Sequence, residues 1–413
     1  MNKKRKLHYG WVVVIGCVLL SATTGLLLGL NSIFIKPVTQ SLSISRSAFS
    51  ATSTIYNCVV MVSVPFMPRL FKKKIFKPLL LIGAVSVAVV HAFYALAPNI
   101  YVMYLLFAIC GFTSCLIGAV PTVILTSNWF VKSRGLATSI AFSGSGISTM
   151  IMSPVITAVI ISSGWRVGYL VIGACCLVLS LVSALFFIKV KPSDMGLAPY
   201  GAEEADVEKT EQKGFTCAQT LRTKSFWIFS FGILLSSLTA YGVIYHIVTF
   251  WTDLGHAAET AAVWFSISNG IGILSKALMG GVYDRLGVRK ASAFCCTLTL
   301  VSFVCLPLSK NAVFAVIAAV FFGLGAGIQI SPPTAMTNAL FGDLAYSSNY
   351  SIVTLIYFIG IAIGNLMSAM IFDKTGSYRP AWIIYAVMIV VTFVLWIVAD
   401  HVAKKERKKI LGE

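Results

Sequence analysis

Twelve apolar runs, each long enough to cross a lipid bilayer, follow one another along this chain of 413 residues. A helix spans about 30 Å of hydrocarbon with roughly 20 apolar residues. We place the runs at residues 11–35, 47–68, 78–97, 100–127, 135–161, 166–188, 225–252, 260–283, 291–308, 311–340, 348–372 and 379–400. They predict an all-α membrane protein with twelve transmembrane helices.

The composition also indicates a membrane protein. Hydrophobic residues make up 58% of the chain and charged residues only 11%, which leaves too little polar surface to coat a soluble globule. The formal net charge is +18, but the basic residues form short clusters between apolar runs, so we expect lipid and no nucleic acid as partner. The ten cysteines show no spacing typical of metal ligands, and we expect neither metal nor cofactor.

The positions of lysine and arginine predict the orientation. If both termini are cytosolic, 25 of the 32 basic residues fall in cytosolic segments. The outer segments hold Lys36, Arg46, Arg166, Lys310, Lys374 and Arg379, and the remaining one is Lys276. This bias follows the positive-inside rule. We therefore expect a multi-pass protein of the cytoplasmic membrane with both termini in the cytosol.

A polar linker separates six runs from six. It covers residues 189–224 and holds six of the 14 acidic residues. We predict an N-terminal six-helix bundle over 1–188, a C-terminal six-helix bundle over 225–403 and a basic cytosolic tail over 404–413. A weak repeat relates the halves, because Arg285 follows Arg69, and Gly360 follows Gly144, by the same 216 residues. Two six-helix repeats around a midplane site are typical of one class of transporters.

Lys276 is a full charge inside the long apolar segment 264–283. A charge at the centre of a membrane helix costs about 2.5–3.5 kcal/mol on translocon scales, so it is retained where it faces protein or a water-filled cavity. Phe265, Asn269, Gly272 and Lys276 recur at helical spacing and share one face. We expect Lys276 to bind an anionic solute. The alternative is a lysine that extends its ammonium group to the membrane surface.

Polar residues of other runs complete the predicted solute site. They are Asn57, Tyr241, His246, Gln329 and Tyr357. Histidine titrates near neutral pH, so His246 could help to carry a coupled proton. The alternatives are a structural histidine that is hydrogen-bonded near the outer interface, and amides that join helices to one another.

Three segments resemble a known family. The stretch 280–290, GGVYDRLGVRK, is similar to the loop signature of the major facilitator superfamily, which there follows helices 2 and 8. WFVKSRGLA at 129–137 and the opening YGW at 9–11 resemble the branch of monocarboxylate and oxalate/formate porters. The resemblance implies gating roles for Asp284, Arg285, Gly287 and Arg289, and for Lys132 and Arg134. For the last two the alternative is that they only set the topology.

The resemblance also bears on the solute. In that branch an arginine shortly before the helix 8 signature contacts the substrate carboxylate, and Lys276 stands at the matching place. Monocarboxylate porters carry an acidic residue one turn before this cation, and Gly272 stands at that place here. The oxalate type carries a second cation, and Phe358 stands at its place. One cation without these companions favours a substrate with a single carboxylate.

We therefore expect a monomeric secondary active transporter that moves a small organic anion, a monocarboxylate, by proton symport or anion exchange. One alternative is an exporter of drugs or other amphipathic compounds with the same fold. Another is a non-transporting solute sensor. We do not expect an enzyme, because the sequence has no nucleophile elbow, metal motif or paired carboxylates.

Overall fold

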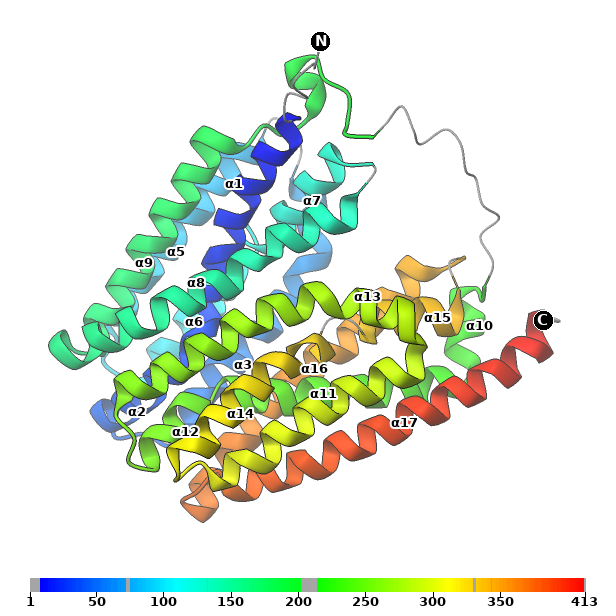
Figure 1. Cartoon of the computed structure of the whole chain (residues 1–413). Helices are drawn as coiled ribbons and strands as arrows, with labels where there is room; N and C mark the ends of the chain where they lie inside the picture. Colours follow the sequence, from blue (N-terminus) through cyan, green and yellow to red (C-terminus); the bar gives the residue numbers. More distant parts are fainter. Residues whose placement is uncertain are drawn as a thin grey trace, which may run out of the picture. The chain divides into compact units, whose positions relative to one another are not determined.

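The computed structural model describes residues 8–71, 75–131, 133–201, 214–329, 332–342 and 344–411. In this part of the chain, twelve helices are long and apolar enough to cross a membrane, as predicted (Figure 1). They are Tyr9–Leu42, Arg46–Phe66, Phe76–Leu96, Ile100–Trp129, Arg134–Ser163, Trp165–Phe187, Lys224–Ile244, Ala258–Met279, Arg285–Leu308, Ala312–Phe341, Ser348–Thr375 and Arg379–Lys409.

The chain divides into two compact units. The first comprises Met1–Asn31 and Cys58–Thr210, and the second comprises Ser32–Asn57 and Glu211–Glu413. The last third of the first span and the first part of the second span therefore make most of their contacts with the helices that follow residue 211.

The first unit is built around α1. Helix α1 (Tyr9–Thr24) packs on α7 (Ala119–Trp129), α8 (Arg134–Ser163) and α9 (Trp165–Val182), and α5 (Phe76–Leu96) packs on α6 (Ile100–Ser114) and α9. A π-helical turn, Gly25–Gly29, follows α1. The short α4 (Met67–Leu70) precedes α5.

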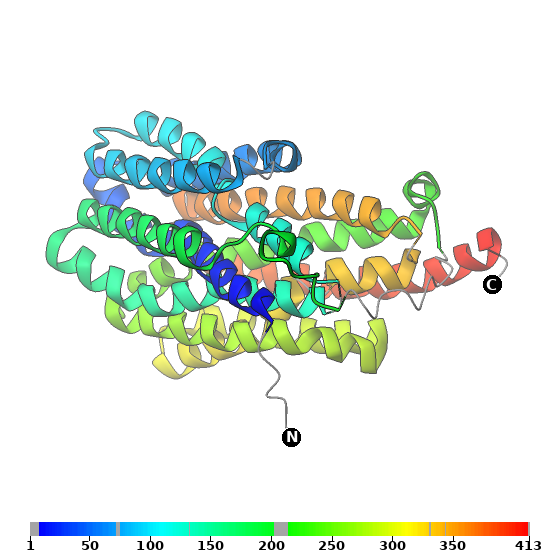
Figure 2. The same cartoon turned by 90° about the horizontal axis from the view of Figure 1, so that it is seen from above.

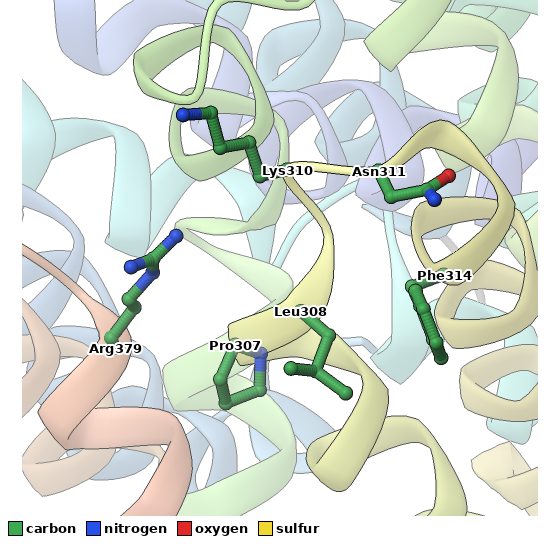
Figure 3. A pocket seen from close by; sticks show the side chains of 6 residues that line it. All are labelled: Pro307, Leu308, Lys310, Asn311, Phe314 and Arg379. Carbon is green, nitrogen blue, oxygen red and sulfur yellow. The ribbon is translucent and has the colours of Figure 1, made fainter.

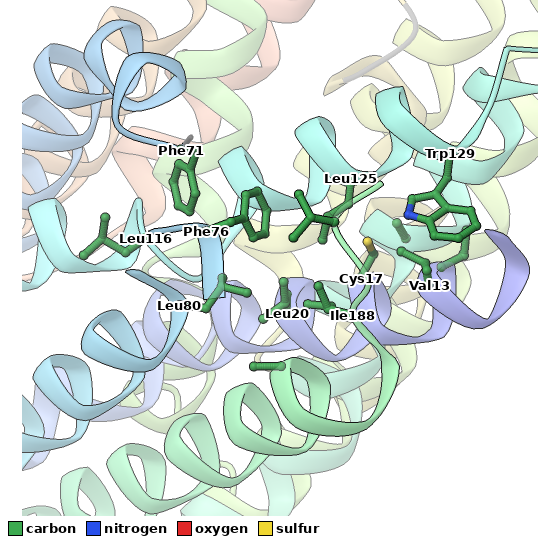
Figure 4. Close-up of a cluster of buried hydrophobic side chains, with 14 of the residues drawn as sticks. Val13, Cys17, Leu20, Phe71, Phe76, Leu80, Leu116, Leu125, Trp129 and Ile188 are labelled. Carbon is green, nitrogen blue, oxygen red and sulfur yellow. The ribbon is translucent and has the colours of Figure 1, made fainter. Parts of the chain in front are cut away.

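A cluster of buried apolar side chains lies in this unit (Figure 4). Val13, Cys17 and Leu20 of α1 meet residues from α5 and α7 and from the segment after α9. Trp129 is fully buried, and its indole N–H donates to the carbonyl oxygen of Lys189 at 2.7 Å. The polar atom of the largest side chain in the cluster is thus satisfied, as burial requires.

Small residues set the distance between α1 and α8. A Cβ atom at Gly144 would overlap the carbonyl oxygen of Val18, so only glycine fits there. Ser21 Oγ donates to the carbonyl oxygen of Ala141 at 2.6 Å, and Ser148 Oγ donates to that of Ala22 at 2.7 Å. Close backbone approach and hydrogen bonds of this kind join helices in a membrane, where lipid removes the hydrophobic drive to associate.

The second unit contains the remaining helices, of which the long ones run side by side in both views (Figures 1 and 2). They are α2 (Asn31–Leu42), α3 (Arg46–Ser63), α10 (Cys217–Arg222), α11 (Lys224–Ile244), α12 (Ile247–Asp253), α13 (Ala258–Cys305), α14 (Ala312–Gly325), α15 (Thr337–Phe341), α16 (Tyr346–Thr375) and α17 (Arg379–Leu411). Of α2 and α3, residues 32–57 belong to this unit. Helix α11 packs on α16 and α17, and α13 packs on α14 and α17.

Helix α13 holds two membrane spans. Its path is interrupted at Gly287, whose backbone has φ 71° and ψ 169°. This combination is open to glycine and closed to other residues. Gly287 is thus the residue at which the chain turns from one span to the next.

The last helix continues into the segment that we predicted as a basic tail. Helix α17 runs to Leu411, so residues 404–411 are helical. The Glu406 carboxylate accepts the backbone N–H of Lys224 at 2.9 Å and that of Ser225 at 3.3 Å. It therefore caps the N-terminus of α11, where a negative charge is favourable.

Candidate functional site

Helix α13 has two opposite faces before its break. Exposed apolar residues occupy one face: Val263, Ile267, Leu274 and Leu278. Lys276 lies two residues from both Leu274 and Leu278, which places it about 200° from each around the helix. An exposed apolar stripe on a membrane helix belongs against lipid, and a charge does not. Lys276 therefore points away from lipid, on the face that also carries Phe265, Asn269 and Gly272.

The turn before Lys276 is fixed against the neighbouring helix. Ser275 Oγ donates to the carbonyl oxygen of Leu324 at 2.5 Å and accepts the Gly327 N–H at 3.3 Å. A Cβ atom at Gly272 would lie 3.3 Å from that of Ala326, so this glycine is close to the same segment. These contacts set the rotation of α13 about its axis, and hence the direction of Lys276.

The Lys276 side chain is exposed. Among the side chains that the structure describes, no carboxylate forms an ion pair with it. Within the same helix, Asn269 Nδ2 donates to the carbonyl oxygen of Phe265 at 2.9 Å, and Phe265 is buried. The face thus presents a positive charge with an amide and an aromatic ring on the turns before it. A cation at membrane depth is costly unless it faces water or a partner, so the arrangement suits an anion.

Three other predicted site residues form a second group. Tyr357 of α16 and Tyr241 of α11 bring their hydroxyl oxygens within 3.4 Å. The Tyr241 ring lies 5.8 Å from that of Tyr245, whose hydroxyl is hydrogen-bonded to Asn57 of α3. Tyr245 was not among the predicted site residues, although it follows Tyr241 by one helical turn. The described contacts join this tyrosine group internally and do not extend to Lys276.

His246 is fully buried between α12 and α16. Its Nε2 lies 3.0 Å from the backbone oxygen and 3.1 Å from the side-chain oxygen of Asn365, so this nitrogen is the donor. Its Nδ1 lies 3.0 Å from the hydroxyl of Tyr378. Burial raises the pKa of Tyr378, and the nearby Arg46 guanidinium offsets this only in part. Tyr378 therefore keeps its proton and donates it to His246, so protein groups occupy both ring nitrogens.

The predicted gating residues are only partly described. Arg285 and Arg289 flank Gly287, and both are exposed. Arg134 Nη2 donates to Ser127 Oγ. Lys132 and the side chains of Asp284 and Gln329 lie outside what the structure describes.

A surface depression of about 610 Å³ lies elsewhere in the second unit (Figure 3). Its lining consists of Pro307, Leu308, Lys310, Asn311, Phe314 and Arg379, and Lys310 and Arg379 are its charged members. None of the residues that we predicted to bind solute belongs to this lining.

Sequence comparison identifies the family. The profile of the Major Facilitator Superfamily matches residues 17–312 and 229–413. The chain belongs to the Major Facilitator Superfamily. The resemblance inferred from the stretch 280–290 is thus confirmed.

Named members of the superfamily are similar along nearly the whole chain. Monocarboxylate transporter 12 of Homo sapiens is 22% identical, over 94% of this chain and 80% of that protein. Monocarboxylate transporter 4 of Rattus norvegicus is 21% identical, over 97% of this chain and 85% of that protein. The predicted resemblance to monocarboxylate porters within the superfamily is therefore confirmed.

Solved structures of the superfamily share the fold. A bacterial homolog of the human lysosomal transporter Spinster superposes with a TM-score of 0.70 at 14% identity, over 98% of this chain and 99% of that one. The nucleoside transporter NupG superposes with a TM-score of 0.67 at 13% identity, over 95% of this chain and 99% of that one. The predicted all-α fold of twelve transmembrane helices in two six-helix bundles is confirmed, and this superfamily member is a multi-pass membrane transporter.

Proposed function

We propose that this transporter moves a small organic anion, most simply a monocarboxylate, and that Lys276 is its electrostatic partner. The observation that carries the proposal is the Lys276 cation on the face of α13 opposite the exposed leucines, which has no ion-pair partner among the side chains that the structure describes. A carboxylate beside the ammonium group would replace the water that the charge otherwise needs. Asn269 and Phe265 on the same face would then contact the rest of a small solute.

The number of charges narrows the solute class. Among the residues that we propose for solute binding, Lys276 is the single cation. Phe358 stands where the oxalate type of porter carries a second cation. A dicarboxylate would bring a second negative charge without a matching cation, and an unpaired buried charge is costly. The names of the similar transporters, monocarboxylate transporters 12 and 4, support the same class.

We further propose that the protein lies in the cytoplasmic membrane and acts as a monomer. Both termini would lie in the cytosol, as the distribution of lysine and arginine favours. Solute would enter and leave by alternating access. The coupling would be proton symport or exchange for a second anion. Two measurements on proteoliposomes separate these modes: a pH gradient drives uptake in symport, and internal anion accelerates uptake in exchange.

Uptake into proteoliposomes tests the role of Lys276. The panel comprises radiolabelled monocarboxylates and dicarboxylates, and the variants are Lys276→Ala and Lys276→Arg. Lys374→Ala is the matched control, because it removes an exposed lysine that ends a different helix. We expect at least about a tenfold loss with Lys276→Ala, since a charge-assisted hydrogen bond contributes about 1.5–3 kcal/mol. Lys276→Arg should keep part of the activity, and Lys374→Ala should be unchanged.

Solute-induced thermal stabilisation provides an independent test of binding. A solute at 100 times its Kd stabilises the folded state by about 2.7 kcal/mol. We expect a higher melting temperature with one or more monocarboxylates, and no shift in Lys276→Ala. Unchanged uptake by Lys276→Ala would refute the assignment. Stabilisation by lipophilic amines instead of acids would identify an exporter of amphipathic compounds, and binding without counterflow would identify a sensor.

A further inference from the structure

Two aspartates of the second unit lie at helix ends where a negative charge is unfavourable. Asp253 is the last residue of α12, and Asp373 lies in the last turn of α16. The C-terminus of a helix carries partial negative charge on its free carbonyl groups, so a carboxylate there is repelled. Both carboxylates therefore need compensation from another part of the fold.

The N-terminus of α3 supplies this compensation. Arg46 Nη1 and Nη2 donate to Asp253 Oδ2 and Oδ1 at 2.5 and 3.0 Å, a bidentate pair. The backbone N–H groups of Arg46 and Ser47 donate to Asp373 Oδ1 and Oδ2 at 3.1 and 2.9 Å. Asp373 thus meets the positive end of the α3 dipole. Lys36 Nζ, 3.6 Å from Asp253 Oδ1, adds a second cation.

Aromatic rings shield this ion pair from water. The guanidinium carbon of Arg46 lies 3.6 Å from the centroid of the Phe372 ring and 5.3 Å from that of Tyr378. The Arg46 side chain is 12% exposed and that of Asp253 is 21% exposed. A pair in open solvent contributes little, because water screens it. The Arg46–Asp253 pair is mostly withdrawn from solvent and is correspondingly stronger.

Further hydrogen bonds hold residues 32–57 to the rest of the second unit. Val248 donates its N–H to Ser32 Oγ at 2.9 Å, and Thr249 Oγ1 donates to the carbonyl oxygen of Ser32 at 2.6 Å. Asn365 Nδ2 donates to the carbonyl oxygen of Ser50 at 2.8 Å. These bonds place residues 32–57 in the second unit, although the chain on either side belongs to the first.

We propose that Arg46, Asp253 and Asp373 form a latch that holds the N-terminus of α3 to the ends of α12 and α16 (labelled in Figure 1) and that opens in each transport cycle. Alternating access requires the two ends of a transporter to open in turn. The latch opens when α3 withdraws, and both carboxylates then lose their partners at the N-terminus of α3. The proposal rests on transport by alternating access and not on the identity of the solute.

A buried reporter cysteine tests the latch. Thr249 is 2% exposed and bonded to Ser32, so Thr249→Cys should react with a maleimide only when this end opens. The reaction is followed on purified protein in detergent, and the rate of the parent with its native cysteines is subtracted. With Arg46→Gln added, we expect about tenfold faster labelling, because the equilibrium shifts by the stabilisation that the closed state has lost.

Three further variants make the test specific. Asp253→Asn should accelerate labelling as Arg46→Gln does. The double variant should be no faster than the faster single one, because both changes remove the same interaction. Arg379→Gln is the matched control, since its side chain is exposed and has no partner among the described residues.

Equal labelling of the Arg46→Gln and Arg379→Gln proteins, both monodisperse, would overturn the latch, and so would additive effects in the double variant. Asp253→Asn, which preserves side-chain volume, decides the question if Arg46→Gln does not fold. No solute is present during labelling, so an error in the solute assignment cannot alter this result. Failure of the latch would in turn leave the uptake results for Lys276 unchanged.

Discussion

Gly144 stands so close to Val18 that a methyl group in place of its Cα hydrogen would overlap the Val18 carbonyl oxygen. The same relationship recurs 216 residues later, where a Cβ atom at Gly360 would lie 2.5 Å from the carbonyl oxygen of Leu234. Each pair joins the first helix of a six-helix repeat to the fifth. The repeat in the sequence therefore corresponds to a repeated helix contact, one in each unit.

Gly144→Ala should destabilise the protein by about 1–3 kcal/mol, because the added methyl group forces α1 and α8 apart. Gly135→Ala is the matched control in α8, since no atom lies within 4 Å of the new Cβ there. Alanine also favours a helix over glycine, so the control should be neutral or slightly stabilising. Thermal unfolding in detergent measures both. Equal melting temperatures for the two variants would contradict the close contact.

Gly287→Asn should cost about 1–3 kcal/mol, because asparagine cannot adopt φ 71° with ψ 169° without strain. Gly376 ends α16 with φ 69° and ψ 8°, a left-handed conformation that asparagine tolerates. Gly376→Asn should therefore leave stability nearly unchanged. Neither Cβ would have an atom within 4 Å, so the comparison isolates backbone conformation. A similar loss in both variants would show that ψ at Gly287 does not matter.

Ser275→Ala should raise the apparent KM for solute while the Lys276 charge is retained. The change removes the bond to Leu324 that orients this turn, and its net cost to stability should be about 0.5–1.5 kcal/mol. Ser302→Ala is the control, because Ser302, in the span after Gly287, also donates to a backbone carbonyl of α14, that of Ala318 at 2.8 Å. It should cost similar stability and leave KM unchanged. Equal KM values for both would separate Ser275 from the site.

His246→Gln should lower stability and leave the pH dependence of uptake unchanged. Both ring nitrogens of His246 already bond to Tyr378 and Asn365. A replacement that leaves one of these buried groups unpaired costs about 1–3 kcal/mol. Melting curves and initial uptake rates from pH 5.5 to 7.5 provide the measurement. A displaced pH profile at unchanged stability would instead assign the coupled proton to His246.

Glu406→Ala should destabilise the N-terminus of α11 by about 0.5–2 kcal/mol, the usual cost of a lost helix cap. Lys405→Ala changes an exposed neighbour and should be neutral. Because Glu406 contacts the backbone of Lys224 and Ser225, a chain that ends at residue 403 should lose as much as Glu406→Ala. Proteolysis at the start of α11, compared with global melting, would detect the local effect. Identical cleavage in the two point variants would argue against the cap.

Hydropathy was sufficient to predict the twelve spans, because a helix that crosses lipid must be long and apolar, and the other segments of the chain are not. It did not predict where they end. The first run was expected to stop at residue 35, where Lys36 begins a more polar stretch, but the span continues to Leu42. Its end is held by partners more than 200 residues away, including Asp253, which no local pattern reveals.

The residues of the candidate site likewise fall into two groups: those that the sequence related to one another, and those whose contacts needed the fold. Helical spacing placed Lys276, Asn269 and Phe265 on one face, because residues three and four apart on a single helix must share it. Spacing says nothing about contacts between helices, so the pairing of Tyr241 with Tyr357 and of His246 with Tyr378 needed the fold. Arg46 was predicted only as an outer cation. Its role depends on Asp253 and Asp373, 207 and 327 residues away.

The π-helical turn Gly25–Gly29 affects how this chain can be aligned with its relatives. Such a turn accommodates one residue more than an α-helical path of the same length. A relative whose first helix is regular throughout therefore needs a gap opposite this turn. Without the gap, every position from Asn31 to Leu42, Lys36 among them, is matched to a residue on a different face of the relative's helix.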